Sequence, residues 1–278
     1  MNALLGTKLS IVSKKPQTTR KRVLGIFSSD TEQIVFLDTP GIMPRPNTLL
    51  HKAMLHEVEK SFADADVILV LAEAQQPFDR ALPAKWEEYK KYAGKKPMIL
   101  AVSKIDLAKR RTDLLPILQH YGEQSEFTEI VPISGAKKKN LEELVKTLRK
   151  YLPEQQPFYD TEQLSDQNER FFVGELIREV IFHKFKEEIP YSTEVQIREF
   201  KEREGGKWYI NADVIVERDS QKAILIGKGG ESLKTLGSIA RNEIERFLEH
   251  PVFLELHVKT RADWRDNKRS LTELGYSA

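Results

Sequence analysis

Short apolar runs alternate with polar stretches of helical periodicity over residues 23–148. Four of the runs are apolar throughout rather than at every second position, which is typical of strands buried on both faces. The expected strands are Ile34–Leu37, Val67–Leu71, Met98–Val102 and Ile130–Ile133, and the expected helices are Leu49–Ser61, Pro83–Tyr92 and Asn140–Tyr151. This pattern predicts an α/β domain with a largely parallel sheet.

The composition then changes. Residues 152–166 contain Pro153, Pro157 and several Gln, Asp and Glu, which indicates a linker. Ser165 or Asp166 is expected to cap a following helix. The buried face of that helix carries Phe172, Leu176, Ile177, Val180 and Ile181.

The remainder of the chain predicts a small α+β unit. Two strands joined by Gly205-Gly206 are followed by a glycine loop, a helix and a last strand. The expected strands are Glu194–Phe200, Trp208–Val216 and Val252–Thr260, and the helix runs from about Glu231 to Leu248.

Composition narrows the classes of function. The 278 residues hold 44 basic and 42 acidic side chains, so the net charge of +2 excludes a histone-like excess of positive charge and makes any nucleic-acid contact local. The absence of cysteine excludes disulfides, thiolate metal sites and a cysteine nucleophile. The six histidines lack metal-ligand spacing, and no apolar run is long enough for a membrane span or a signal core.

A first chemical motif, Asp38-Thr39-Pro40-Gly41, directly follows the strand Ile34–Leu37. A carboxylate at this end of a strand can support a magnesium ion through water, and a glycine lets a backbone amide approach a phosphate. An ordinary Asp-to-Pro-Gly turn explains the same residues, so the motif alone does not decide.

A second motif, Ser103-Lys104-Ile105-Asp106, follows the expected buried strand Met98–Val102. An aspartate can accept hydrogen bonds from the ring N–H and amino group of guanine while a lysine stem lies over the purine. Strand ends of this kind bind nucleotides in α/β sheets. Ile133-Ser134-Gly135 ends a further strand and can present backbone amides to the base. A solvated lysine and aspartate remain the plain alternative.

The order of these motifs after Pro16-Gln17-Thr18-Thr19-Arg20 resembles the nucleotide domain of translation-factor-like GTPases. SIVSKKPQTTRKRVLGI followed by FLDTPGI narrows the resemblance to the Era GTPases, ribosome-assembly factors with a GTPase domain and a type II KH domain. The resemblance covers essentially all of the chain. It implies an Era-type α/β P-loop-type G domain over 1–152, a linker over 153–166 and an α+β type II KH domain over 167–278.

The resemblance also implies a site for GTP or GDP with Mg²⁺. Thr18 or Thr19 closes over magnesium and the terminal phosphate, Asp38 supports the metal, Gly41 senses that phosphate, and Lys104 with Asp106 selects guanine. The implied nucleotide-binding residues are Asp38, Thr39, Pro40, Gly41, Ile42, Ser103, Lys104, Ile105, Asp106, Ser134 and Gly135, and the implied switch region is Gln17, Thr18, Thr19, Arg20 and Lys21.

Several positions depart from the family pattern. Ser103 stands where asparagine is usual, which shortens a side chain that braces neighbouring loops and lowers the expected base affinity by about 1 kcal/mol. Gly135 replaces an alanine, a mild change. Ile42 offers no side chain to orient an attacking water, so slow, partner-stimulated or backbone-assisted hydrolysis is expected, although Ile42 can simply pack.

The phosphate-binding pattern G-x-x-x-x-G-K-[ST] is not found in the sequence. Residues 1–6 instead look like the helix that follows this loop in Era-like proteins. We therefore expect the chain to be N-terminally incomplete, with a strand missing between Ile34–Leu37 and Val67–Leu71, and GTP binding by this polypeptide to be impaired.

The segment from Ile224 to Lys234 matches the KH signature. A Gly-x-x-Gly turn between helices lets a nucleic-acid backbone approach without Cβ clashes. Ile224–Ile226 is expected to pack behind the turn, and the alternative is a glycine-rich connection without RNA binding. The candidate RNA-binding residues are Gly227, Lys228, Gly229, Gly230 and Lys234.

Basic side chains gather in two further stretches, each of which is either a nucleic-acid contact or a solvated face. Trp264 and Tyr276 can stack on bases or pack in the core. The first stretch holds Lys14, Lys15, Arg20, Lys21 and Arg22, and the second holds Lys259, Arg261, Arg265, Lys268 and Arg269.

The resemblance thus implies a GTP-binding and GTP-hydrolysing ribosome-assembly factor that binds 16S rRNA and the 30S subunit through its KH domain. We also expect a monomer in the cytoplasm that associates peripherally with the inner face of the cell membrane. The alternatives are a non-enzymatic RNA-binding protein with a degenerate nucleotide domain and an RNA-independent membrane-associated regulator.

Overall fold

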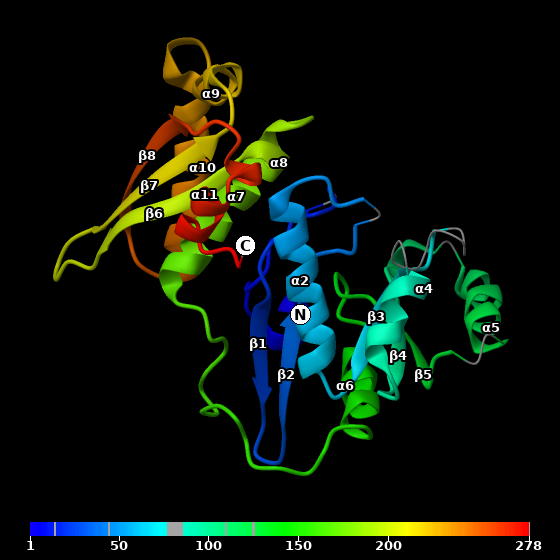
Figure 1. Ribbon diagram of the computed structural model, residues 1–278. Helices are drawn as coiled ribbons and strands as arrows, with labels where there is room; N and C mark the ends of the chain where they lie inside the picture. The colour runs from blue at the N-terminus through cyan, green and yellow to red at the C-terminus, as the bar shows by residue number, and fades with distance from the viewer. Residues whose placement is uncertain (14, 44, 77–85, 109, 124–125, 278) are drawn as a thin grey trace. The chain divides into compact units, whose positions relative to one another are not determined.

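The computed structural model describes residues 1–13, 15–43, 45–76, 86–108, 110–123 and 126–277. The chain forms two compact units, coloured along the sequence in Figure 1. The first unit comprises Met1–Thr7, Gly25–Arg45 and Leu55–Leu164, and the second comprises Lys8–Leu24, Pro46–Met54 and Ser165–Ala278. Two segments from the first quarter of the sequence therefore belong to the second unit. The domain boundaries expected from the sequence, 1–152, 153–166 and 167–278, stay a prediction.

In the first unit, all four apolar runs form strands, as predicted. Its elements are α1 (Asn2–Leu5), β1 (Val23–Ser28), β2 (Gln33–Asp38), α2 (Leu49–Asp64), β3 (Ile68–Glu73), α4 (Trp86–Tyr89), β4 (Met98–Ser103), α5 (Leu115–Glu123), β5 (Glu129–Pro132) and α6 (Leu141–Arg149). The first residues of β1 and of α2 are assigned to the second unit. The expected helix Pro83–Tyr92 is described only from residue 86, where α4 continues into a 3-10 helix, Lys90–Ala93; residues 83–85 lie outside the described part.

Strands β3, β4 and β5 form a parallel sheet, in which Leu100 pairs with Val70 on one side and Ile130 on the other. Alternate side chains of β4 enter two different cores, because Leu100 and Val102 pack on one face and Ile99 and Ala101 on the other. Burial on both faces explains why these strands are apolar at every position.

Strand β2 lies outside this parallel sheet, in agreement with the expectation that it is not a direct neighbour of β3. This strand pairs with β1 in a separate two-stranded sheet, and no ladder joins β2 to β3 among the described strands. The sequence did not indicate β1, which contains Gly25. A Cβ on Gly25 would come within 2.5 Å of Leu5 and Met1 side-chain atoms, so glycine here lets α1 pack directly on the strand.

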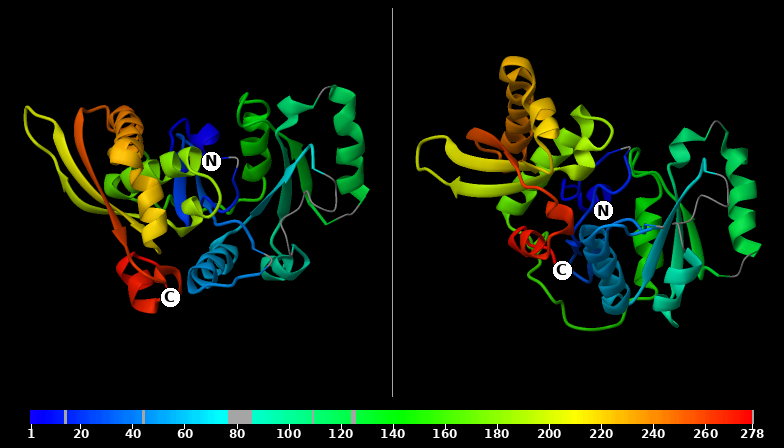
Figure 2. Two further views of the ribbon diagram at one scale, coloured as in Figure 1. Left: turned by 90° about the horizontal axis from the view of Figure 1, so that it is seen from above. Right: turned by 45° about the horizontal axis from the view of Figure 1, so that its top comes forward.

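The second unit has the predicted order of helix, two strands, glycine turn, helix and strand. Its elements are α7 (Glu169–Lys184), α8 (Ile189–Ser192), β6 (Glu194–Lys201), β7 (Trp208–Val216), α9 (Asp219–Ile226), α10 (Glu231–Leu248), β8 (Val252–Thr260) and α11 (Lys268–Glu273). Strand β7 pairs antiparallel with β6 and parallel with β8. Helices α7 and α10 pack on one face of this sheet, as Figure 2 shows.

The cap of α7 differs from the prediction. Asn168, rather than Ser165 or Asp166, is the N-cap residue, and its Oδ1 accepts a hydrogen bond of 3.0 Å from the Phe171 backbone amide. Ser165 donates its hydroxyl to the Leu24 carbonyl oxygen at 2.6 Å instead. A side-chain oxygen caps only when it reaches the second or third helical amide, and in α7 this is the position of Asn168.

Candidate functional site

The loop after β4 carries the predicted guanine-reading residues. Lys104 has a left-handed backbone, with φ 59° and ψ 32°, which is uncommon for a non-glycine residue and turns the chain out of the strand. Ser103, just before it, donates its hydroxyl to the Ala72 carbonyl oxygen of β3 at 3.0 Å. The shorter side chain at this position therefore braces the neighbouring strand.

Asp106 is oriented by the loop that follows β5. The buried Ser134 hydroxyl donates to Asp106 Oδ1 and accepts a hydrogen bond from the Lys137 amide at 3.0 Å. The Ile105 amide also reaches the Ile133 carbonyl oxygen, at 3.3 Å. The Ser134 hydrogen bond is the main reason that the pKa of Asp106 lies below its usual value. The loop thus presents an ionised, fixed acceptor at the end of a parallel strand.

Glu73 belongs to the same arrangement, although the sequence analysis did not identify it. It lies opposite Ser103 in the register of β3 and β4, and its carboxylate pairs with the Lys104 ammonium. Gly135, next to Ser134, is exposed. The structure therefore brings together the second and third sequence motifs, whereas their roles toward a nucleotide stay predictions.

The segment after β2 contains the predicted phosphate-sensing residues. Asp38 ends the strand, Pro40 is buried and Gly41 is exposed. Ile42 packs against the apolar core around Val70 and Leu100, so the packing alternative for this side chain is confirmed.

The predicted switch region lies in the second unit. Gln17 has a left-handed backbone with φ 61°. The Thr18 carbonyl oxygen accepts a hydrogen bond from the buried Arg178 guanidinium, and the Lys21 ammonium donates to the Leu274 carbonyl oxygen at 2.8 Å. The segment is thus attached at several points to α7 and to the C-terminal residues.

The first basic stretch is not simply a solvated face. The Lys15 ammonium donates to the Phe182 and Phe185 carbonyl oxygens at the end of α7. Lys21 lies over the Tyr276 ring, with 4.7 Å between its Nζ and the ring centroid. Lys14 lies outside the described residues.

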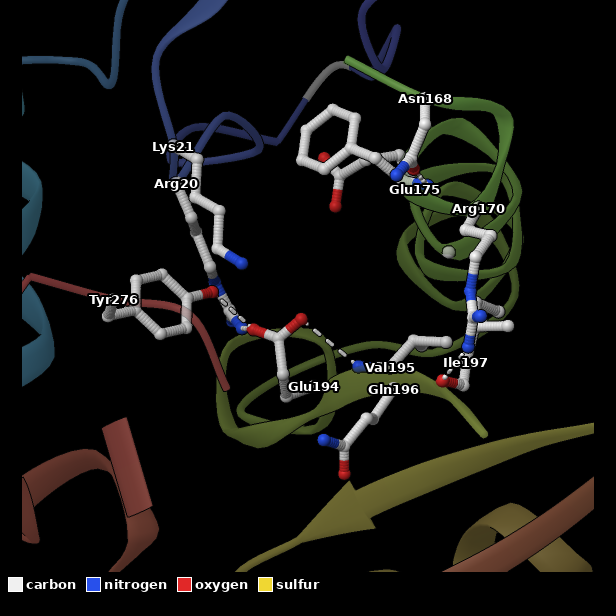
Figure 3. A pocket seen from close by; sticks show the side chains of 12 residues that line it. Arg20, Lys21, Asn168, Arg170, Glu175, Glu194, Val195, Gln196, Ile197 and Tyr276 are labelled. Carbon is white, nitrogen blue, oxygen red and sulfur yellow. Dashed lines mark hydrogen bonds and ion pairs between the residues drawn. The ribbon is translucent and has the colours of Figure 1, made fainter. Parts of the chain in front are cut away.

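Glu194 is the centre of a buried polar cluster that the sequence analysis missed. Its Oε2 is 2.9 Å from Nη1 of Arg20 and accepts a hydrogen bond from the Tyr276 hydroxyl, and the side chains of Arg20 and Glu194 are only 4% and 8% exposed. Figure 3 shows both partners converging on the carboxylate at the edge of a surface pocket. Burial alone raises the pKa of Glu194, but the charges of Arg20, Arg178 and Lys21 outweigh it and hold the pKa below its usual value.

This cluster predicts a pH dependence of stability. A carboxyl with a lowered pKa in the folded state stabilises the fold above its ordinary pKa of 4.5 and loses that contribution as the pH falls through its folded value. The difference in unfolding free energy between wild type and Glu194→Gln should therefore be largest above pH 4.5 and shrink below it. Urea titrations across this range measure the difference; a gap that is independent of pH would contradict the assignment.

The glycine turn of the KH signature has the backbone that it needs. Gly227, Gly229 and Gly230 have φ of 73°, 59° and 81°, so α9 ends and α10 begins within four residues. Lys228 and Lys234 are both exposed beside the turn. No atom lies within 4 Å of a Cβ built on Gly229, so the backbone of the turn is open to an approaching chain.

The burial of individual side chains decides two expectations of the sequence analysis, one for Ile224–Ile226 and one for the aromatic rings of Trp264 and Tyr276. Leu225 is fully buried, but Ile224 is 51% exposed, so the prediction that it packs behind the turn was wrong. Trp264 is fully buried, donates its indole N–H to the Ser192 carbonyl oxygen at 2.9 Å, and packs in the core, as does Tyr276. Neither aromatic ring is available for stacking on a base.

The second basic stretch is largely paired within the unit. Lys259 lies 2.7 Å from Asp213, Arg261 and Arg269 both pair with Glu273, and Arg265 pairs with the Glu217 carboxylate. Paired arginines on a surface contribute less net charge to a nucleic-acid contact than the sequence alone suggests.

The candidate site has oxygen ligands that suit a hard cation such as Mg²⁺, but the described side chains do not form a complete coordination site. Among the described residues, no group of three or more His, Cys, Asp or Glu side chains is placed to hold a metal ion. A carboxylate such as Asp38 and a threonine hydroxyl suit Mg²⁺ when phosphates and water complete its coordination. None of the described helices is long and apolar enough to cross a membrane.

Two known families match parts of this chain. The family described as "50S ribosome-binding GTPase" matches residues 1–104, and the KH domain family matches residues 188–265. The GTPase Era of Lacticaseibacillus paracasei is 42% identical over 283 residues, which span 100% of this chain and 91% of the relative.

Two solved structures are similar over 100% of this chain and 93% of their own, each at 39% identity. One is Era Y63A of Aquifex aeolicus bound to GDP·AlF4⁻, with a TM-score of 0.91. The other is Era in complex with MgGDPNP and nucleotides 1506–1542 of 16S ribosomal RNA, with a TM-score of 0.92. The chain belongs to the Era family of GTPases.

Proposed function

We propose that this protein is a GTP-binding and GTP-hydrolysing ribosome-assembly factor that binds the 3′ region of 16S rRNA through its KH domain. The observation that carries the proposal is the similarity over the whole chain to a structure solved with both a guanine nucleotide and a 16S rRNA fragment. The Asp106 loop and the Gly227–Gly230 turn supply the local chemistry for the two ligands.

Asp106 would accept hydrogen bonds from the guanine ring N–H and amino group, while the Lys104 stem lies over the purine. Ser134 keeps the carboxylate oriented and ionised. The Gly135 amide would face the base. Asp38 would support the Mg²⁺ that neutralises phosphate charge in GTP hydrolysis. Ile42 packs in the core and offers no group to orient a water, so hydrolysis is slow unless a partner or a backbone group assists.

The glycine turn would hold single-stranded RNA. An RNA backbone can lie against Gly229 without meeting a side chain, and the ammonium groups of Lys228 and Lys234 are exposed for its phosphates. The partner that follows is 16S rRNA within the assembling 30S subunit. We further propose a cytoplasmic monomer that associates peripherally with the membrane; a chain without cysteine suits a reducing compartment.

Base selectivity tests the nucleotide part of this proposal. The wild type should prefer GDP to ADP and to XDP, whereas Asp106→Asn should shift the preference from GDP toward XDP, because the amide reverses one donor–acceptor relation. Competition between nucleotides in a thermal-shift titration measures the order. Asp113→Asn, an equal change of charge in the same unit, should leave the order unaltered. An unaltered order in Asp106→Asn would reject Asp106 as the guanine reader.

A further inference from the structure

Residues 15–21 are held within the second unit by four donor side chains. Lys15 and Lys21 donate to carbonyl oxygens at the end of α7 and near the C-terminus, and Arg178 donates to the Thr18 carbonyl oxygen. Arg20 contributes the most contacts. This segment includes the two threonines that the family resemblance assigns to magnesium and the terminal phosphate.

The Arg20 guanidinium is fully enclosed at the end of α8. Besides Glu194, it donates to the carbonyl oxygens of Thr193 at 2.8 Å, Tyr191 at 2.8 Å and Pro190 at 3.2 Å. The planar fork of a guanidinium can satisfy such a set of acceptors, and an ammonium cannot. The backbone at position 20 is therefore held firmly, one residue after Thr19.

The helix that follows the Asp38–Gly41 motif shows a second attachment of the same kind. Residues 46–54 belong to the second unit, and the Leu49 amide at the start of α2 donates to Asp266 Oδ1 at 3.0 Å. Thr48 caps the same turn, accepting from the His51 amide at 3.2 Å. The start of α2 is thus also held within the second unit.

We propose that Glu194 is a positioning residue for the Thr18–Thr19 segment, which it holds through Arg20. The inference rests on the proposed function, in which these threonines meet magnesium and the terminal phosphate. Only the triphosphate carries the terminal phosphate, so Glu194 supports binding of the triphosphate state and not of the diphosphate state.

Hydrogen exchange on the intact chain tests the anchoring without any nucleotide. Glu194→Gln removes the charge that holds Arg20, and amides 15–22 should exchange at least about tenfold faster, since a hydrogen bond to a charged group is lost. Glu217→Gln is the matched control, because Glu217 is equally buried, at 9% exposure, and pairs with Arg265 in the same unit. Equal exchange of residues 15–22 in both variants would overturn the proposal.

Two further variants keep the test valid if Glu194→Gln folds poorly by circular dichroism. Tyr276→Phe removes one hydrogen bond from the carboxylate and leaves the ion pair, so it should accelerate exchange by less than Glu194→Gln would. Arg20→Lys keeps the charge but cannot satisfy the carbonyl oxygens, and should accelerate it more than Tyr276→Phe. The reverse order would contradict a role through Arg20.

Nucleotide affinity separates positioning from a merely structural role. In Glu194→Gln, affinity for Mg·GDPNP should fall about tenfold while affinity for GDP stays within about twofold, because only the former uses the terminal phosphate. An equal loss for both would overturn the inference. A wild type that binds neither nucleotide would remove the proposed function, and positioning with it, whereas the exchange result would still show whether Glu194 anchors the segment.

Discussion

Arg20→Met should lower the free energy of unfolding of this protein by about 3 kcal/mol, the largest effect expected of a single substitution here. The change leaves the Glu194 carboxylate buried without its principal partner, and an uncompensated charge in the interior is strongly unfavourable. The nearby charges of Arg178 and Lys21 keep the loss at the lower end of the usual range. Denaturant titrations followed by circular dichroism measure it.

Arg269→Met is the matched control for that substitution. Arg269 also pairs with a glutamate, at 3.1 Å, but its side chain is 90% exposed and α11 places the pair in solvent. Exposed pairs contribute at most about 1 kcal/mol. Should both variants lose the same free energy, the cluster around Glu194 would be no more important than an ordinary surface pair.

The double variant Lys228→Asp, Gly229→Asp should reduce affinity for single-stranded RNA by about 100-fold. It replaces an exposed ammonium with a carboxylate and adds a second carboxylate where a phosphate backbone must approach. The fold should survive, because the space around Gly229 is open and aspartate tolerates a left-handed backbone better than most residues. Fluorescence anisotropy with a labelled RNA measures the loss.

Gly206→Asp with Lys207→Asp is the corresponding control. This exposed Gly-Lys pair lies between β6 and β7 of the same unit, so the charge change is identical and the location is not. Comparable losses of RNA affinity in the two double variants would mean that net charge, and not the glycine turn, determines binding.

The buried strands were predictable because burial on one or both faces gives a strand a recognisable local pattern of apolar residues. Strand β4 is apolar throughout since both of its faces are covered, and β7 and β8 were predicted with their observed bounds. Helix α5 was missed because Pro116 and Gly122 within it normally indicate loops. Strand β1 was missed because its glycine is required by α1, a contact between segments that lie apart in the sequence.

Some parts of the candidate site could likewise be predicted from the sequence, and other parts could not. The guanine-reading loop could be predicted, because Ser103 to Asp106 follow a recognisable strand and Ser134 ends the next one. The anchoring of the switch region could not, since Arg20 and Glu194 are 174 residues apart and nothing near either residue indicates the other. A charged residue that becomes buried through a distant partner has the same local pattern as one on the surface.

The central claim is that this chain combines an Era-type nucleotide domain with a KH domain that binds the single-stranded 3′ region of 16S rRNA. Its most direct test is a binding titration of the protein with an RNA of nucleotides 1506–1542, the fragment bound in the related Era complex. The titration is repeated after that RNA has been paired to a complementary oligonucleotide. We predict tight binding of the free fragment and a loss of at least about 100-fold on pairing, because a KH groove admits unpaired bases. Equal affinity for the two RNAs would contradict the account.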